Sequence, residues 1–533
     1  MTGPAIIQAL DITGKLMELH DGNPFKIKAY SNAAYKLSKL RYDFEGKTIA
    51  EIQSIEGIGK SIAEKINELI ATGTTTELSD LLDRTPPGVI EMLGVKGLGS
   101  KKVRQLWREL NIESVGELLY ACSENRLVTL KGFGPKTQAQ VLQSIEFRNS
   151  SANKFLYAAI EKPLLNLVNA LGSTGNIQVA ITGEVARKNE IIEKIEILLD
   201  AEPAVDVEAF HKAIPLPVNY LHCAASDFQY RLIETSSTSA HLAQSGFSSL
   251  ARKNFKTGEE IYEALCMQYV EPELREGLGE VDLARKRKIP RLIELGDLRG
   301  ILHNHSTYSD GIHTLKEMAD YCREMGYAYF GICDHSRSAF YAQGLSVEKV
   351  LEQQQEIERL NAGYRDFTIL KGIESDILSD GALDYPEEIL STFDFVVASV
   401  HSNLKMDEKK ATARVINAVE NPYTNILGHP SGRLLLARKG YPLDYRKVID
   451  ACAANGVSVE LNANPYRLDI DWRWIPYCLE KGVMISINPD AHHKQGLHDM
   501  YYGVCAARKG MLPASGCLNA LPLAGLLDEF RKK

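Results

Sequence analysis

The stretch Ile301-Leu302-His303-Asn304-His305-Ser306-Thr307-Tyr308-Ser309-Asp310-Gly311 decides the fold of the C-terminal part of the chain. Its apolar start leads directly into two histidines at positions i and i+2. Two residues at this spacing on a β-strand point to the same face, so one metal ion can bind both imidazoles. The stretch therefore predicts a strand that ends in a metal site.

Further histidines and carboxylates recur at the ends of later predicted strands. The candidate ligands are His303, His305, Asp310, His335, Glu374, His401, His429, Asp490 and His492. Imidazole and carboxylate are the ligands of hydrolytic transition-metal sites. Any single histidine in such a place can instead be a hydrogen-bonded loop residue, and we interpret His313, His493 and His498 in that way because they fit no motif. Nine residues in strand-end order indicate a metal site.

The same region alternates short apolar, β-branched runs with amphipathic helical runs. The predicted strands are Gly300–His305, Tyr327–Asp334, Phe367–Asp376, Phe393–His401, Thr424–His429, Val457–Asn462 and Val483–Asn488. The predicted helices between them include Leu315–Met325, Val347–Asn361, Tyr445–Asn455 and Trp472–Lys481. This alternation predicts a parallel barrel of seven β/α units. The active site of such barrels lies at the strand C-termini.

The first 150 residues have helical periodicity that three short glycine motifs interrupt. The motif residues and the lysines that follow them are Gly57, Gly59, Lys60, Lys65, Gly97, Gly99, Lys101, Lys102, Gly132, Gly134 and Lys136. Two glycines around an apolar residue make a tight turn that leaves backbone N–H groups at a helix N-terminus, where a phosphate oxygen can bind. One such motif is typical of a glycine cap between packed helices. Three motifs with flanking lysines favour sequence-nonspecific contact with the DNA backbone.

The segments Asn23–Tyr30 and Gly57–Ile66 resemble the N-terminal domain of family X DNA polymerases. The resemblance implies helix-hairpin-helix domains at 1–85 and 86–150, then an α+β nucleotidyltransferase-like palm and thumb at 151–290. In some members the lysine that matches Lys65 forms a Schiff base with a 5′-deoxyribose phosphate. A phosphate-contacting or solvated lysine is the simpler interpretation of Lys65.

The palm-like segment 182–198 keeps the length of the family's nucleotide-binding strand-turn-strand but loses its chemistry. The family pattern is Gly-Ser-x-Arg-Arg followed by Asp-x-Asp and a third Asp. The departures are Glu184 for the serine, Ala186 for the first arginine, Lys194 and Glu196 for two aspartates, and Asn219 for the third. Nucleotidyl transfer needs carboxylates that hold two metal ions, so we predict an inactive polymerase region. The alternative is a repair polymerase with displaced carboxylates, drawn from Asp200, Asp206 and Glu208.

The barrel motifs resemble the PHP (polymerase and histidinol phosphatase) superfamily of metal-dependent phosphoesterases, here over residues 297–533. The motifs are His303-x-His305, Asp310-Gly311, Asp334-His335, Glu374-Ser375-Asp376, Ser399-Val400-His401, Gly428-His429-Pro430 and Asp490-Ala491-His492. The resemblance implies three divalent ions, Mn or Zn. His303, His305, Glu374 and Asp490 would hold the first; Glu374, His401 and His429 the second; and Asp310, His335 and His492 the third.

In such a site a metal-bound water attacks the phosphoester. Arg433, Arg467 and Lys405 are candidate phosphate clamps, with a surface salt bridge as the alternative role for each. Asp376 or Asp334 is expected to orient the ligands from behind.

Bulk properties limit the function classes further. The chain of 533 residues has a net charge of −8, so it lacks the overall positive charge of proteins that bind DNA over their whole surface, and any DNA contact would use local basic patches. Its nine cysteines are scattered, and it has no leader-like start and no apolar run of about 18 residues. We therefore expect a cytoplasmic monomer with reduced thiols.

Together these features predict a DNA-binding phosphodiesterase, a 3′–5′ exonuclease in DNA repair, with abasic-site processing as a related activity. The alternatives are a small-molecule phosphatase of the histidinol-phosphate type, a non-enzymatic DNA-binding scaffold with a metal-stabilised barrel, and the repair polymerase named above.

Overall fold

The computed structural model describes residues 1–533 except 41–43, 45, 111, 116–117, 119–120, 123–126, 128–129, 131, 151–152, 174–176, 203–206, 437–438 and 533. The chain divides into two compact units, Met1–Ala152 and Asn153–Lys533. Asp206, one of the carboxylates in the repair-polymerase alternative, lies outside the described residues.

The first unit is helical, as predicted, and is built around one apolar core. Its described helices are α1 (Gly3–Leu19), α2 (Pro24–Leu40), α3 (Ile49–Gln53), α4 (Lys60–Thr72), α5 (Thr76–Asp83), α6 (Pro87–Met92), α7 (Ser100–Leu110) and α9 (Pro135–Ser150). Helical spacing places Ile6, Leu10 and Leu16 on the buried side of α1. The core extends from Ile6 to Ile145. The finer division at residue 85 stays a prediction.

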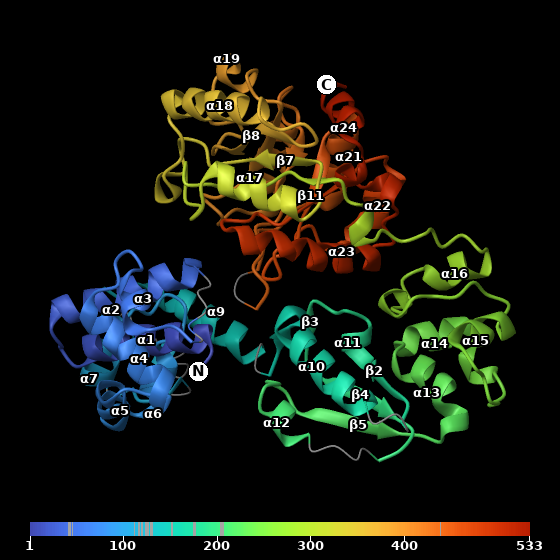
Figure 1. The fold of residues 1–533 in the computed structure, drawn as a ribbon, viewed down its shortest axis with the longest axis horizontal. Helices are drawn as coiled ribbons and strands as arrows, with labels where there is room; N and C mark the ends of the chain where they lie inside the picture. Colours follow the sequence, from blue (N-terminus) through green and yellow to red (C-terminus); the bar gives the residue numbers. More distant parts are fainter. Residues whose placement is uncertain are drawn as a thin grey trace. The chain divides into compact units, whose positions relative to one another are not determined.

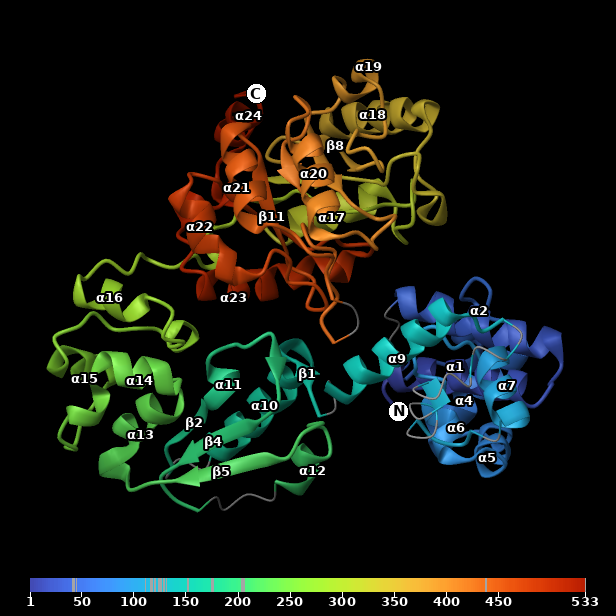
Figure 2. The ribbon, with the colours of Figure 1, turned by 180° about the vertical axis from the view of Figure 1, so that it is seen from behind.

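The second unit begins with a small mixed α/β region. Strand β4 (Ile195–Leu199) lies between β2 (Val179–Thr182), which is antiparallel to it, and β5 (Val218–His222), which is parallel (Figure 2). The other elements are β1 (Phe155–Leu156), α10 (Tyr157–Gly172), α11 (Gly183–Ala186), β3 (Ile191–Ile192) and α12 (Glu208–His211). Alternate residues of β4 are buried against apolar residues of α10, which gives this region a core of its own.

A helical segment with a separate apolar core follows the small sheet. It consists of η2 (Ala225–Asp227), α13 (Phe228–Thr235), α14 (Ser239–Ser245), η3 (Phe247–Ser249), α15 (Gly258–Ala264), η4 (Pro272–Leu274) and α16 (Glu280–Arg285). Its interior also contains a buried histidine whose two ring nitrogens both have partners. His241 lies 2.6 Å from Glu280 and 2.8 Å from the Tyr262 hydroxyl.

The rest of the second unit is a nearly closed parallel barrel, as predicted. Its strands are β6 (Gly300–Ile301), β7 (Tyr329–Ile332), β8 (Thr368–Asp376), β9 (Phe395–Ser399), β10 (Ile426–Leu427), β11 (Ser458–Asn462) and β12 (Ile485–Asn488), in that spatial order. Beyond β6 and β12 the two ends of the sheet meet. The His305 N–H donates to the Ala491 carbonyl at 2.9 Å, and the Asp490 N–H donates to the His303 carbonyl at 3.1 Å.

Helices surround the strands on the outside (Figure 1). They are α17 (Leu315–Glu324), α18 (Val347–Asn361), α19 (Glu387–Leu390), α20 (Glu408–Val419), α21 (Tyr445–Ala454), α22 (Ile475–Glu480), α23 (Met500–Lys509) and α24 (Leu523–Phe530). Short 3-10 turns join them: η5 (Leu295–Asp297), η6 (Phe340–Ala342), η7 (Trp472–Trp474), η8 (Lys494–Asp499), η9 (Ala514–Gly516) and η10 (Leu518–Ala520).

Two barrel elements differ in detail from the sequence prediction. The predicted helix Trp472–Lys481 is split into η7 and α22, because Pro476 suits only the first turn of a helix. Only two residues of each of the first and fifth predicted strands form regular strand, β6 and β10. After β6 the pairing continues less regularly, because the Cys333 N–H donates to the Asn304 carbonyl at 2.7 Å and Asn304 pairs with Ala491.

The composition also led us to expect that the chain has no membrane-spanning helix and that its cysteines are reduced. Among the described residues, no helix has both the length and the apolar character that a bilayer crossing requires. All nine cysteine sulfurs are unbridged, and most of them are buried.

Candidate metal centre and phosphate-binding turns

The nine predicted ligands converge at the C-terminal end of the barrel strands. Most of them follow a strand directly or occupy its last residues, so parallel strand ends bring distant sequence positions together. Three groups have ligand atoms within 4.8 Å of one another: His305, Asp310, His335 and His492; His303, His305 and Asp490; and His335, Glu374 and His401. His429 joins them through Glu374.

Glu374, which is completely buried, is the centre of this cluster. Its Oε1 lies 3.0 Å from His429 Nε2, 3.2 Å from His401 Nε2 and 3.4 Å from His303 Nε2. Its Oε2 lies 3.0 Å from His335 Nδ1. Oε2 also lies 3.6 Å from His305 Nε2, and one carboxylate that faces five imidazoles has the geometry of a bridging ligand.

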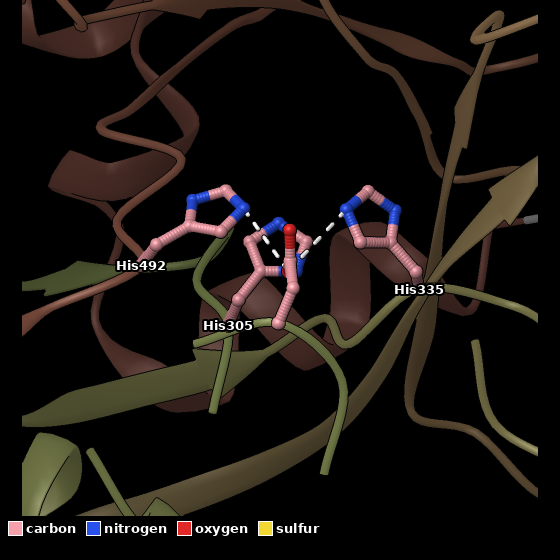
Figure 3. Close-up of side chains that lie close together, drawn as sticks. His305, His335 and His492 are labelled. Carbon is pink, nitrogen blue, oxygen red and sulfur yellow. Dashed lines mark ion pairs between the residues drawn. The ribbon is translucent and has the colours of Figure 1, made fainter. Parts of the chain in front are cut away.

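The second carboxylate, Asp310, lies between two imidazoles at the mouth of the barrel. Its Oδ1 is 3.2 Å from His492 Nε2 and 3.7 Å from His335 Nε2. Figure 3 shows His492, His305 and His335 side by side in this group. The third carboxylate, Asp490, lies 3.0 Å from His305 Nε2 and therefore connects the groups.

The electrostatics of the cluster fit divalent cations. Burial lowers the pKa of His303, but Glu460, Glu374 and Asp490 outweigh it and raise the pKa well above its usual value. The opposite holds for His305, where burial and the neighbouring His492 and His335 lower the pKa to about 3. Within the described residues, the buried His303 Nε2 and Glu374 Oε2 have no hydrogen-bond partner. Buried acceptors and imidazoles of this kind suit a cation that replaces their protons.

The residues behind the ligands fix their orientation. Asp376 accepts from His401 Nδ1 at 2.6 Å, as expected for a carboxylate that orients a ligating imidazole. Burial lowers the pKa of His401, but Glu374 and Asp376 outweigh it and raise the pKa to about 10. The hydrogen-bond partners of the Asp334 carboxylate, by contrast, are not candidate ligands. It accepts from Ser306, Ser309 and Gln353 and so holds the loop that leads to Asp310.

Glu460 is a residue that our sequence reasoning missed. Its completely buried carboxylate accepts from His303 Nδ1 at 2.7 Å, from the His429 N–H at 2.7 Å and from Asn488 at 3.1 Å. It thereby fixes two candidate ligands from different strands. The available signal was a lone carboxylate inside the apolar run of the predicted strand 457–462. A buried charge of this kind requires partners.

The three clamp candidates have different environments. Arg467 Nε lies 3.7 Å from Asp490 Oδ2, at the edge of the cluster. The donors of Arg433 are used elsewhere, because they bond to Asp471 at 2.7 Å and to the carbonyl oxygens of Arg467 at 2.9 Å and of Leu468. Lys405 is an exposed residue in the loop after His401. The geometry favours Arg467 over Arg433.

The histidines that we interpreted as loop residues have structural bonds. The His493 side chain caps η8 by accepting from the Gly496 N–H. His313 accepts from the Lys494 N–H at 3.4 Å, and His498 lies 2.8 Å from the Tyr321 hydroxyl.

The three glycine motifs form the same turn. The N–H groups of Ile58, Leu98 and Phe133 donate to the carbonyl three residues earlier, at 3.0, 3.1 and 3.0 Å. The first glycine of each motif has a left-handed φ of 84°, 91° or 88°, as the third position of a type II turn requires.

The second glycine of each motif, at 59, 99 and 134, faces open space, so a ligand can approach the backbone. Lys60, Lys101 and Lys136 are exposed at the helix starts that follow. Lys65 is half-buried and pairs with Glu68 at 2.7 Å, and Lys102 lies over the Phe133 ring.

The palm positions lack a carboxylate cluster. The strand register places Glu196 beside Thr182 and Asn219, and Lys194 directly precedes β4. Glu184 accepts from the Glu193 and Lys194 N–H groups and closes the turn between β2 and β4. Ala186 ends the short helix α11.

Comparisons with known proteins follow the same division of the chain. Residues 1–75 match a helix-hairpin-helix domain, 89–146 a SAM-like helix-hairpin-helix tandem, and 302–464 the PHP domain. The DNA polymerase/3′-5′ exonuclease PolX of Bacillus subtilis (strain 168) is 31% identical over 99% of both chains. A probable phosphatase of Acetivibrio thermocellus is 32% identical, over 36% of this chain and 78% of the phosphatase.

The PHP domain and the full-length relative identify an enzyme of the metal-dependent phosphoesterase type. Because the similarity to the Bacillus protein covers both helix-hairpin-helix regions, the middle region and the barrel, this chain belongs to the family X DNA polymerases that have a C-terminal PHP domain.

Proposed function

We propose that this protein binds DNA and hydrolyses its phosphodiester bonds in the barrel, as a 3′–5′ exonuclease in DNA repair. The observation that carries this proposal is the convergence of nine ligand-type side chains at the barrel mouth. Abasic-site processing is a related reaction that the same centre would perform. The polymerase-like region is proposed to be inactive.

The ligand groups fit three divalent cations, which we propose to be Mn or Zn because imidazole and carboxylate suit both. His303, His305, Glu374 and Asp490 would hold one, Glu374 with His401 and His429 a second, and Asp310, His335 and His492 a third. Bound divalent cations lower the pKa of water and offset the negative charge that develops on a phosphodiester under attack.

The chain's own residues position both the ligands and the substrate. Glu460 and Asp376 accept hydrogen bonds from the Nδ1 atoms of His303 and His401, so the Nε2 atoms of both rings face Glu374, where a bound cation would replace their protons. Arg467 is proposed to bind a non-bridging phosphate oxygen, because its guanidinium is planar, always charged and adjacent to Asp490.

The three glycine turns are proposed to hold the DNA backbone without reading its sequence. Each presents N–H groups at a helix start, beside an exposed backbone and a lysine. We also propose that the protein is a cytoplasmic monomer, as its cysteine pattern and charge suggest.

The proposal of an inactive palm rests on charge. Lys194 and Asn219 supply no carboxylate, and Lys194 adds a positive charge where the family holds metal ions. A cation beside a metal site is strongly unfavourable without compensation. Residual polymerase activity is the alternative, since the Bacillus relative is named a DNA polymerase as well as an exonuclease.

A second candidate function is hydrolysis of a small phosphomonoester. The probable phosphatases among the relatives favour it, although they match only 23% and 36% of this chain. The glycine turns favour DNA instead, since a small-molecule phosphatase has no use for them.

The test is to incubate the protein and a His303→Ala variant with 3′-labelled single-stranded and gapped DNA in Mn²⁺, with and without dNTPs. Metal-dependent shortening by the wild type alone is expected. Extension products would refute the inactive palm, and hydrolysis of histidinol phosphate without DNA degradation would refute the nuclease.

A further inference from the structure

The palm turn of the second unit is packed against the barrel through a buried lysine. Lys509, at the end of α23, is 2% exposed. Its Nζ donates to the Arg187 carbonyl at 2.7 Å and to Asn189 Oδ1 at 3.2 Å, both in the turn after α11. It also donates to Glu276 Oε1 at 2.8 Å. A buried ammonium with this many acceptors fixes the turn to the barrel.

Arg187, the second arginine of the family's nucleotide-binding pattern, has a structural role in this contact. Its Nε lies 3.5 Å from Glu276, and only 11% of its side chain is exposed. The preceding barrel residue, Arg508, pairs with the buried Glu273 at 2.5 Å. The turn that faces a triphosphate in the family pattern is therefore partly buried and attached to the barrel.

The same turn reaches the barrel loop that contains Arg467. We call residues 464–471 the arginine loop. Glu190 Oε1 lies 4.0 Å from Arg433 and 3.6 Å from Arg473, and 12% of its side chain is exposed. Asp471 binds the same two arginines at 2.7 and 3.0 Å, so charges of opposite sign alternate around this small cluster.

Arg433 connects Glu190 to the arginine loop beside the candidate metal centre. Its Nε donates to the Arg467 carbonyl at 2.9 Å, and another of its N–H groups donates to the Leu468 carbonyl. Pro465 and Leu468 also line a small pocket together with Tyr157 and Lys188 of the palm. The Arg467 guanidinium then lies 3.7 Å from Asp490.

We propose that the palm turn 187–190 is a positioning element for the phosphodiesterase. Glu190 fixes Arg433 and Arg473, and through them the arginine loop and the Arg467 side chain beside the candidate metal centre. This inference rests on the proposed function for the role of Arg467. It gives the degenerate palm a task in the barrel reaction that requires neither nucleotide nor palm metal ions.

The test compares Glu190→Gln with Glu193→Gln, a matched control that lies just after β3. Glu193 is half exposed and pairs only with Lys154 of the palm among the described ion pairs. We expect Glu190→Gln to raise the KM for 3′-labelled single-stranded DNA by roughly five- to tenfold, with kcat changed less and metal content unchanged. Hydrogen exchange in the arginine loop is expected to be faster in Glu190→Gln alone.

A double-mutant cycle with Arg467→Ala adds a second readout. If Glu190 acts through Arg467, the double variant is no worse than Arg467→Ala within about twofold. Losses that multiply would overturn the proposal. Unchanged exchange in the arginine loop would also overturn it.

Two further outcomes are distinguishable. If the wild type does not hydrolyse DNA, the proposed function fails, but hydrogen exchange still decides whether Glu190 positions the loop. If Glu190→Gln does not fold, Arg473→Gln, at a residue that is 54% exposed, removes one of the two Glu190 ion pairs together with the Asp471–Arg473 pair. Arg473→Gln is then expected to give the same faster exchange in the arginine loop, and its absence would overturn the proposal.

Discussion

The small palm sheet and the barrel both gather polar side chains at strand ends, but only the barrel buries them. At the barrel mouth, Glu374 is completely buried and faces five imidazoles. At the palm, Lys194 and Asn219 are exposed and Glu196 is half-buried. Burying a charge is costly unless it is paired or binds a metal. The barrel therefore holds its polar side chains in a buried cluster of mutual contacts, whereas the palm side chains are open to solvent and need no partner.

The largest effect on the barrel centre is expected from a change of Glu374, because this carboxylate contacts five of the candidate ligands. Glu374→Gln is expected to lower the DNA hydrolysis rate by at least about a hundredfold, more than the loss of an outer partner. Metal content by mass spectrometry should fall with it. The control is Glu358→Gln, which removes an exposed partner of Lys371. Full activity of Glu374→Gln would contradict the metal centre.

A smaller loss is expected at Glu460, which touches the ligands from behind. In Glu460→Gln one amide N–H₂ group must face a donor, either His303 Nδ1–H or the His429 N–H. We expect metal affinity to fall about 10- to 100-fold. Titration of the apoprotein with Mn²⁺ measures this. A metal affinity equal to that of the wild type would show that Glu460 is only a packing residue.

The glycine turns should affect DNA binding without affecting the barrel. Gly59→Val keeps an ordinary backbone conformation and meets no atom within 4 Å, so the fold is retained. The new side chain covers the backbone that a phosphate would approach. We expect weaker DNA binding and a salt-dependence slope lower by about 0.7 to 0.9 for each phosphate that the variant no longer binds. Metal content and hydrolysis of a small phosphodiester should not change, and Gly296→Val is a control with equal space.

The smallest effect is expected in the palm sheet. Lys194→Ala removes an exposed charge and should change DNA hydrolysis by less than about twofold, as most surface substitutions do. It should produce no primer extension, because the missing carboxylates are not restored. Extension assays with dNTPs on gapped DNA check this. Extension by this variant would show that Lys194 alone suppresses a competent polymerase site.

Much of the fold could be predicted from local patterns. The strand-end positions of the nine candidate ligands followed from apolar runs and His or carboxylate residues at their ends, and all nine come together. The three turns followed from glycine spacing, because only glycine adopts the left-handed φ without strain. The lengths of β6 and β10 did not follow, because pairing depends on neighbouring strands.

The sequence by itself determined which His, Asp and Glu residues stand at strand ends and the order of the strands along the chain, since these depend on residue type and local periodicity. Only the tertiary structure decided the partners. Glu460 meets His303 across 157 positions, and Lys509 meets Arg187 across 322. Such contacts depend on how distant elements pack, and no local pattern encodes them. The same packing distinguished Arg467, beside the metal centre, from Arg433, which supports its loop.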